Sequence, residues 1–288
     1  MTAVTSIKSP HDLTITPRDR RFGRGKSQNR WWLGNDPIAT AFYNALSITF
    51  PRGEAFFVES VRAHRDDAPE KLKGEINAFI KQEVIHSREH VSFNKRVVGA
   101  GYNIEALEQA VTESLELTKG RPEILNLAVT MALEHYTATL AQQLLANPAH
   151  LARADQESAD LWRWHAIEEI EHKGVAYDTW LHATRDWTRW KRWKVKSLLM
   201  LIVTIKFWPR RFKGTKLLLA QDGISGGSTN LKILWFMLAK PGMLTRILPA
   251  WLAYFMPGFH PWNHDDRHLI KLVESDYQDA KMPEALAA

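Results

Sequence analysis

Apolar side chains recur at intervals of three and four residues along much of the chain, which is the spacing typical of amphipathic α-helices. The first such helix begins at Asp36-Pro37, where a capping side chain precedes a proline that suits the first helical turn. Pro51 and Gly53 then interrupt the pattern, before a second helical run over residues 54–63. Pro51 therefore either kinks one long helix or separates two.

Four further helices are predicted between residues 69 and 184. One runs from Pro69 to the glycines at 99–101, residues 104–117 form an ordinary amphipathic helix, and residues 155–184 form one long helix. Residues 124–145 are apolar on nearly every side, so this helix should lie in the interior. Its acidic residue, Glu134, would be costly to bury there without a cationic partner.

The chain changes character after Asp186. Tryptophans alternate with lysines and arginines over residues 187–196 and lead into an apolar run at 198–205, well short of the ~20 residues that span a bilayer. Two later apolar segments, 231–239 and 243–255, are interrupted by proline or arginine, so we predict no transmembrane helix. The prediction is an all-α chain with a flexible basic arm (1–30), a helical bundle (31–185) and a hydrophobic, Trp-rich helical extension (186–288).

Charge and the N-terminal sequence bear on location and partners. The first 30 residues lack the apolar core of a signal peptide, so we expect a cytoplasmic protein. The net charge of +6 would suit nucleic acid or an anionic membrane, but no nucleic-acid-binding motif is recognisable. The Trp-rich basic segment favours a membrane surface, which would place the protein at the inner face of the membrane. The alternatives are that the extension packs on the bundle or forms a homodimer interface.

A chain of 288 residues can bury a large core. It contains no cysteine. This composition excludes disulfides, thiolate nucleophiles, zinc-thiolate sites and cysteine-ligated iron–sulfur clusters. Histidine and carboxylate side chains are the strong metal ligands that remain, and they favour iron, manganese or zinc.

Two Glu-x-x-His pairs are the most informative motifs. With 12 histidines in 288 residues, each Glu has a chance of about 4% of a His three positions later, so one pair alone means little. The chain has two pairs, Glu83/His86 and Glu169/His172, each within a predicted helix. Residues three apart on a helix share a face, so each pair can grip one ion.

A lone carboxylate precedes each pair, on the helix before it. Glu54 precedes the first pair and Glu134 the second. One Glu from each of two helices and Glu-x-x-His from each of two others is the set that a four-helix dinuclear metal site requires. We therefore predict two bound metal ions, most simply iron, in a ferritin-like four-helix bundle. The alternative is a coincidental set of buried polar pairs.

The sequence resembles a bacterial family known as predicted metal-dependent hydrolases. The resemblance covers roughly residues 36–266 and rests on the ligand motifs and their surroundings. These are Phe50-Pro51-Arg52-Gly53-Glu54, the segment Glu83 to His90, Leu133-Glu134-His135-Tyr136, the segment Trp164 to Lys173, and Phe259-His260-Pro261-Trp262. The resemblance implies a ferritin-like ligand pattern.

His165 extends the pattern to His-x-x-x-Glu-x-x-His, which is similar to the last bundle helix of di-iron arylamine N-oxygenases. That resemblance implies that His165 is a seventh metal ligand; the alternative is that it packs beneath a tryptophan and binds a backbone group. His90, one turn after His86, is a candidate hydrogen-bond donor to a metal ligand, or a proton carrier, without a direct bond to metal. Tyr136 and Tyr177 could line a substrate pocket or the second shell, although aromatic residues at helical spacing usually belong to the core.

Other polar residues near the motifs are expected elsewhere. Glu168 and Glu171 flank the ligand stripe and should face solvent or pair with arginine, although Glu171 could replace Glu169 if the register differs. His135 should point to a neighbouring helix. The segment 259–266 lacks helical ligand spacing, so we expect it to dock the tail onto the bundle.

Three functions agree with this pattern. The first is a di-iron oxidoreductase that takes electrons from a donor and uses dioxygen to oxidise a small or apolar organic substrate. The second is a metal-dependent hydrolase, in which paired ions lower the pKa of a bound water to about 7. The third is a non-enzymatic iron-binding or membrane-peripheral protein. The sequence leaves the substrate and the identity of the metal open.

Overall fold

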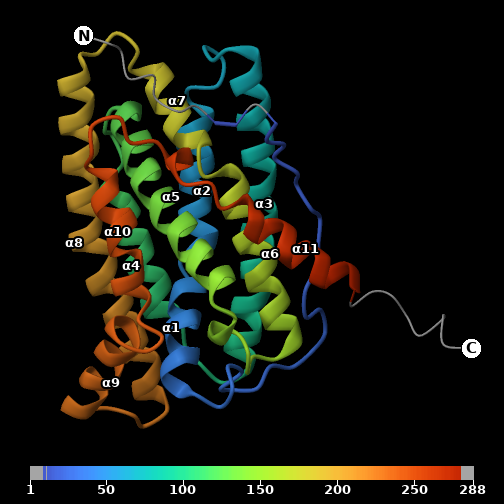
Figure 1. Cartoon of the computed structure of the whole chain (residues 1–288). Helices are drawn as coiled ribbons and strands as arrows, with labels where there is room; N and C mark the ends of the chain where they lie inside the picture. The colour runs from blue at the N-terminus through green and yellow to red at the C-terminus, as the bar shows by residue number, and fades with distance from the viewer. Residues whose placement is uncertain (1–8, 11, 280–288) are drawn as a thin grey trace, which may run out of the picture.

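The computed structural model describes residues 9–10 and 12–279, and this part of the chain folds into α-helices without strands. The predicted all-α fold is confirmed. Most helices stand roughly parallel, and α11 crosses the front of the molecule (Figure 1). The elements are α1 (Pro37–Ser47), α2 (Phe50–Arg62), α3 (Glu70–Gly99), α4 (Glu105–Glu116), α5 (Glu123–Ala146), η1 (Pro148–His150), α6 (Gln156–His172), α7 (Val175–Ala183), α8 (Arg189–Gln221), α9 (Gly227–Leu238), α10 (Met243–Tyr254), η2 (Pro261–Asn263) and α11 (Arg267–Asp279).

Four helices, α2, α3, α5 and α6, enclose the centre of the molecule. Helix α2 packs against α3 and α5, and α6 packs against the same two helices, so the four form a closed bundle. The short connections after α2 and after α5 make each consecutive pair antiparallel. The bundle interior is filled by large apolar side chains such as Phe79, Met131 and Leu161, which are almost completely buried. A ferritin-like relationship for this bundle stays a prediction.

Two helix boundaries decide how the ligand helices are oriented. Pro51 lies in the first turn of α2, and α1 ends at Ser47, so the proline separates two helices instead of kinking one. The prediction of one helix over 155–184 was wrong, because the chain breaks between α6 and α7 at Lys173-Gly174. A Cβ atom at Gly174 would lie only 2.7 Å from the Ser9 hydroxyl and from the Trp262 indole nitrogen. Segments distant in the sequence thus require a glycine here, which local periodicity does not reveal.

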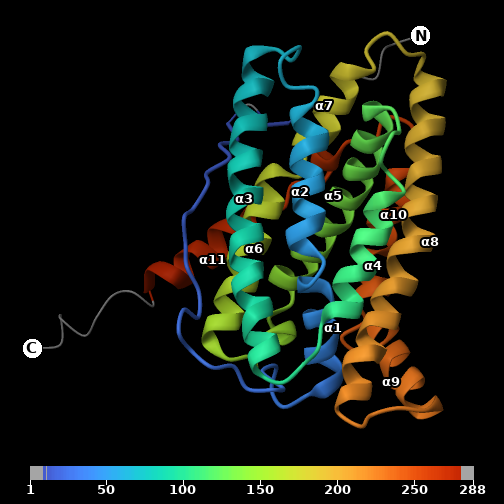
Figure 2. The same ribbon diagram turned by 180° about the vertical axis from the view of Figure 1, so that it is seen from behind.

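Residues 12–30, predicted as part of a flexible arm, run along the outside of α3 and α6 (Figures 1 and 2). The Arg18 guanidinium donates two hydrogen bonds to Glu171, at 2.7 and 2.9 Å, and one to Glu274 at 2.7 Å. The backbone N–H of Phe22 donates to the buried Glu89 carboxylate at 3.0 Å. Because these carboxylates on α3 and α6 need donors, the basic arm is held against the bundle. Residues 1–8 and 11 of the predicted arm lie outside the described residues.

The segment after α10 docks on α6 and α7, as the sequence suggested. The Lys173 ammonium donates to the Asp266 carboxylate and to the carbonyl of His264, at 2.5 and 2.9 Å. The His260 ring and the Asp178 carboxylate lie 3.0 Å apart. Buried pairs of this kind fix the tail, which then continues into α11 against α6.

The C-terminal extension packs on the bundle through α8 and α10. Helix α8 contacts α1 and α5, and α10 contacts α5. The apolar run at 198–205 belongs to this 33-residue α8, whose outer side remains polar or basic at many positions. In the described part of the chain, every helix is too short or too polar to cross a bilayer.

One buried carboxylate, Asp222 at the end of α8, joins the extension to the start of the bundle. It accepts hydrogen bonds from the Arg30 guanidinium at 2.5 Å, the Trp31 indole at 3.1 Å and the Tyr102 hydroxyl at 2.7 Å. Its side chain exposes only 1% of its surface.

We expect Asp222→Ala to lower the free energy of unfolding by about 2–4 kcal/mol, because three donors would lose one buried acceptor. Urea denaturation followed by circular dichroism measures the change. Asp66→Ala is the matched control: Asp66 pairs with Arg65 on the surface, so its loss should cost less than about 0.5 kcal/mol. Equal effects of the two substitutions would contradict the proposed role of Asp222.

Candidate metal centre

The bundle brings all seven predicted metal ligands together in its interior. Each of them exposes at most 4% of its surface. Helix α2 supplies one, α3 two, α5 one and α6 three, because their positions on each helix face inward. The residues are Glu54, Glu83, His86, Glu134, His165, Glu169 and His172.

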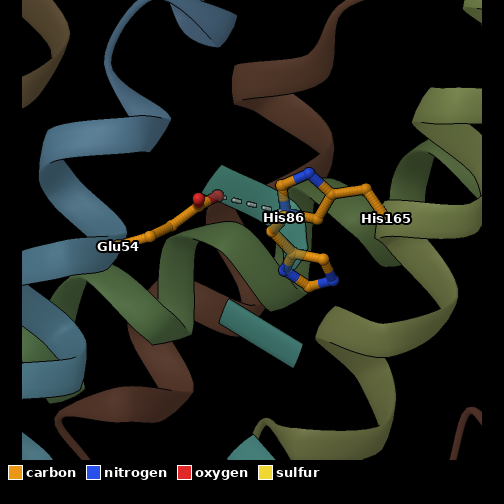
Figure 3. Close-up of side chains that lie close together, drawn as sticks. All are labelled: Glu54, His86 and His165. Atoms are coloured by element: carbon orange, nitrogen blue, oxygen red, sulfur yellow. Dashed lines mark ion pairs between the residues drawn. The ribbon is translucent and has the colours of Figure 1, made fainter. Parts of the chain in front are cut away.

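The ligand atoms form two adjacent groups. In the first, Glu54 from α2, His86 from α3 and His165 from α6 each offer one atom, and these atoms lie within 4.8 Å of one another. Figure 3 shows the three side chains converging from their separate helices. The second group, formed by Glu83, Glu169 and His172, meets the same criterion. Two ions could thus be held side by side.

Glu169 lies between the two groups. Its Oε1 is 2.7 Å from His165 Nε2 and 3.6 Å from His86 Nδ1, in the first group. Its Oε2 is 3.5 Å from His172 Nε2, in the second. Glu83 has a similar position, with Oε1 3.2 Å from His172 Nε2 and 3.9 Å from His86 Nδ1. These two carboxylates, one from each Glu-x-x-His pair, are therefore placed to bridge two ions.

The two lone carboxylates lie beside different groups. Glu54 Oε1 is 3.8 Å from His165 Nε2, in the first group. Glu134 Oε2 is 3.4 Å from His172 Nε2, so Glu134 adds a further oxygen to the second group. Each group consequently has access to a terminal carboxylate, at least one imidazole and the two bridging carboxylates.

Many of these inward-facing atoms are buried without a hydrogen bond. Both oxygens of Glu83 and of Glu134 lack a partner, as do one oxygen each of Glu54 and Glu169 and one nitrogen each of His86 and His172. Leaving so many polar atoms unpaired would cost several kcal/mol, whereas metal coordination satisfies them. Four carboxylates would also balance the charge of two divalent cations. The residues present therefore fit a dinuclear centre with oxygen and nitrogen ligands.

Each ligand histidine is oriented by a contact on its other nitrogen. His86 Nε2 lies 3.0 Å from the Glu168 carboxylate, and His172 Nδ1 lies 3.0 Å from the Gln82 side-chain oxygen. If these nitrogens carry the protons, His86 Nδ1 and His172 Nε2 present lone pairs to the interior. Outer contacts of this kind hold the rings of metal-binding histidines in place.

His165 is oriented by a chain of buried polar groups that leads to α1. Its Nδ1 lies 2.6 Å from His90 Nε2, and His90 Nδ1 lies 2.8 Å from the Ser47 hydroxyl. Ser47 donates in turn to the Asn94 side-chain oxygen at 2.7 Å. If each group donates to the next, His165 Nε2 is free of its proton and can present a lone pair to the interior, where it lies 2.7 Å from Glu169 Oε1. His90 thus occupies the outer position that the sequence suggested for it.

Burial shifts the pKa values of the acidic ligands. It raises the pKa of Glu54 and Glu83 well above the ordinary value, and repulsion between the neighbouring carboxylates adds to this effect. Burial also raises the pKa of Glu134 to about 7. For Glu169 burial acts in the same direction, but attraction to His172 and hydrogen bonding outweigh it and hold the pKa well below the ordinary value.

Burial and neighbouring charges also shift the pKa values of the histidines, in different directions. Burial, together with repulsion from His165, lowers the pKa of His86 and of His90 well below the ordinary value, so both rings are neutral. Burial opposes protonation of His172 as well, but the surrounding carboxylates raise its pKa well above the ordinary value. Without metal, a proton on His172 would therefore partly neutralise Glu134 and Glu169, as a bound cation would.

Several polar residues lie in places other than those predicted. The Tyr136 hydroxyl lies 2.7 Å from the Thr204 hydroxyl, and the Tyr177 hydroxyl donates to the carbonyl of Phe259 at 2.6 Å. Both tyrosines are thus directed to the C-terminal extension, and not toward the metal ligands or a substrate pocket beside them as the sequence suggested. His135 contacts the carbonyl of Ala250, on a neighbouring helix as expected.

Glu171 pairs with Arg18, as expected, and does not replace Glu169 among the clustered ligand atoms. Glu168 also pairs with Arg18, as expected, with its Oε1 3.6 Å from the guanidinium, and it accepts a hydrogen bond from the backbone N–H of Arg18. It is completely buried, so it does not face solvent. Burial raises its pKa to about 7. Its role beside His86, like that of Gln82 beside His172, was missed. The available signal was their position immediately before a ligand Glu.

The comparisons with known proteins agree with the metal centre at the level of family. The model of the family described as predicted metal-dependent hydrolase matches residues 16–265, a range that contains every candidate ligand. No curated protein and no solved structure matches the chain. The similarity to ferritin-like proteins and to N-oxygenases stays a prediction. With most of its length matched, the chain belongs to the family of predicted metal-dependent hydrolases.

Proposed function

We propose that this protein is a dinuclear-metal oxidoreductase that uses dioxygen to oxidise an apolar organic substrate. The observation that supports this proposal best is the ligand set, in which four carboxylates and three imidazoles meet in a buried helical interior. Seven side-chain ligands leave little room around two ions for a bulky polar substrate, but enough for a small molecule such as dioxygen. Iron is the metal that we favour, and manganese and zinc fit the same ligand types.

The chemistry requires an electron donor as well as the metals. In the simplest reaction of this class, one atom of dioxygen enters the substrate and the other leaves as water, with two electrons from an external reductant and two protons. Two bound irons would supply the redox chemistry. Glu83 and Glu169 would contact both ions, whereas Glu54 and Glu134 would each contact one of them. A separate electron-donor protein or small reductant is therefore part of the proposal.

Aromatic side chains around the ligands would keep water out. The Trp164 ring lies edge-on to His86, with ring centroids 4.9 Å apart, and the Phe79 ring lies 4.9 Å from that of His172. The Phe50 ring centroid is 4.7 Å from that of His165. A water-poor site strengthens the electrostatic interactions of bound ions and protects reactive species from side reactions.

A metal-dependent hydrolase is the second candidate, and the family description is what favours it. Two ions held by these carboxylates could lower the pKa of a bound water to about 7 and place it against an ester, amide or phosphate. A hydrolase would also need room for such a polar group beside the ions. The two candidates differ in their need for dioxygen and in their tolerance of a redox-inactive metal.

We also propose that the extension contacts an anionic membrane surface, which would place the protein at the inner face of the cytoplasmic membrane. Exposed apolar residues recur at helical spacing on α8, at Leu198, Leu201 and Ile205, and similar stripes lie on α9 and α10. Trp190, which is 61% exposed, lies about two turns before this stripe among lysines and arginines. Apolar stripes with flanking cations suit binding in the membrane interface. Self-association into a homodimer would cover the same stripe.

Metal affinity should rise with pH. Below pH 7, Glu134 and His172 hold protons that an incoming cation must displace, whereas Glu169 is already ionised. We expect manganese(II) to bind at least tenfold more tightly at pH 6.5 than at pH 5.5, with release of protons on binding. Competition with a chelating indicator measures the affinity, and binding in two buffers of different ionisation enthalpy measures the protons. An affinity that is independent of pH would contradict the assignment of these ligands.

The proposed oxidation predicts that protein loaded anaerobically with two ferrous ions per chain consumes dioxygen. Glu134→Ala should slow this consumption about 100-fold or more, because the second group loses its terminal carboxylate. Glu113→Ala, at an exposed position on α4, is the control and should retain the full rate. An oxygen electrode measures the rate. An unchanged rate of dioxygen consumption in Glu134→Ala would contradict the proposed oxidation. Anaerobic ester hydrolysis by zinc-loaded protein would favour the hydrolase.

The membrane proposal predicts that the protein co-sediments with vesicles that contain anionic phospholipid at low salt, and less at high salt. The double substitution Leu201→Glu/Ile205→Glu should weaken binding at least tenfold, because it places charge on the apolar stripe. Val84→Glu/Val91→Glu makes the matched change on α3, where both valines are exposed, and should bind as the unmodified protein does. Absence of binding at low salt would rule out the membrane surface. A dimer that Leu201→Glu/Ile205→Glu dissociates would point to self-association.

A further inference from the structure

An apolar cavity of about 240 Å³ lies between α2, α4, α5 and α8. Figure 2 shows α4 beside α2 and α8 on this side of the molecule. Its walls are largely aliphatic and aromatic, with Phe56 from α2, Val111 from α4, Leu133 from α5 and Val203 from α8 among them. A cavity of this size approaches the ~300–1,000 Å³ typical of small-molecule sites.

The charged side chains that line this cavity are all basic. They are Arg121, Lys206, Arg210 and Arg211, and no aspartate or glutamate is among the described residues of the wall. None of the four has an ion pair with a carboxylate among the described residues. The cavity thus combines an apolar body with a concentration of positive charge.

Arg211 is the most informative of these cations, because it is 92% buried in the folded chain. Its Nη1 donates to the carbonyl of Ala45 at 2.8 Å, while its Nε has no hydrogen-bond partner. Burial, together with repulsion from Arg210, lowers its pKa to about 10, so the side chain is still charged at neutral pH. A buried guanidinium without a carboxylate is costly, and an anion bound in the cavity would offset that cost.

The cavity adjoins the metal centre. A second, smaller cavity of about 30 Å³ is lined by His165 and Glu169. Four side chains line both cavities and therefore separate the larger cavity from the smaller one: Leu46, Phe50, Thr137 and Leu140. Arg211 contacts Ala45, the neighbour of Leu46, and therefore lies toward this shared wall. An occupant of the larger cavity would have part of its length next to the proposed metal ligands.

We propose that the cavity binds a long-chain carboxylate, with the head group at Arg211 and the alkyl chain along the walls of α2, α4, α5 and α8. This inference rests on the proposed function for the claim that such a carboxylate is the substrate to be oxidised. The binding itself depends only on the cavity and its cations. The apolar walls match an alkyl chain, because its methylene groups leave water when they are buried against them. The carboxylate matches the guanidinium by charge and by geometry.

Binding can be tested on the full-length, metal-free protein with dodecanoate below its micelle-forming concentration. Isothermal titration calorimetry should show one dodecanoate per chain, with dodecan-1-ol and dodecyltrimethylammonium binding at least tenfold more weakly. Equal binding of the alcohol would overturn the role of the cations. Dodecyl phosphate distinguishes the anion type, since tighter binding of this compound than of dodecanoate would overturn the carboxylate assignment.

Two substitutions test the location. Arg211→Met should weaken dodecanoate binding at least tenfold without unfolding the protein, because it removes an unpaired buried charge. Lys213→Met is the matched control, since Lys213 is exposed on the same helix and does not line the cavity. Gly53→Leu should abolish binding by filling the cavity, because a Cβ atom at Gly53 would meet no other atom within 4 Å. Undiminished binding in Arg211→Met or Gly53→Leu would overturn the proposed site.

The outcomes separate this inference from the proposed function. Dodecanoate binding in protein that consumes no dioxygen would leave the cavity assignment intact and refute the oxidation. Oxygen consumption by the ferrous protein without dodecanoate binding would refute the cavity assignment and leave the oxidation intact. Circular dichroism and manganese(II) binding of each variant show that the fold and the metal centre are retained.

Discussion

The structure depends on the burial of several ionisable side chains in the middle of an apolar helical bundle. Four carboxylates and three imidazoles occupy positions that leucine or valine would fill in an ordinary bundle. Their mutual attraction and the outer contacts offset only part of the cost, since many inward-facing atoms have no partner. Metal ions would supply the missing interactions. The same ligands that would perform the chemistry therefore also decide how stable the bundle is.

Because the ionisable side chains are costly to bury, further hydrogen-bond contacts around them hold them in position. Each histidine of the set is held from outside, by Glu168, Gln82 or His90. Glu168 in turn accepts from the backbone of Arg18, so support for His86 extends to the N-terminal arm. A ligand that moved by 1 Å would lose much of its affinity for metal, and these outer contacts restrict such movement.

The sequence predicted which candidate ligands come together better than it predicted their surroundings. Glu83, His86, Glu169 and His172 could be identified because helical periodicity fixes which residues share a face, and this geometry is local. Their assembly from separate helices followed from the known requirements of four-helix sites. The all-α fold and the docking of the tail were predicted for the same reason, from periodicity and its interruptions.

What the sequence did not predict depends on contacts between distant segments. The break at Gly174 reflects the approach of Ser9 and Trp262, and the buried state of Glu168 reflects the path of the arm. The hydroxyl groups of Tyr136 and Tyr177 turned to the extension, whose packing no local pattern describes. Arg211 gave no signal at all, because a basic residue near the end of an apolar run reads as a surface residue until its burial is known.

The three-way contact of Arg18 has a consequence for the order in which the protein is completed. Arg18 joins α6 to Glu274 on α11, a residue 256 positions later in the chain. During synthesis, every helix that carries a candidate ligand leaves the ribosome before Glu274 does, so the contact between Arg18 and Glu274 can form only after those helices are available to pack. This contact between the N-terminal arm and α11 can thus be completed only when nearly the whole chain has been made.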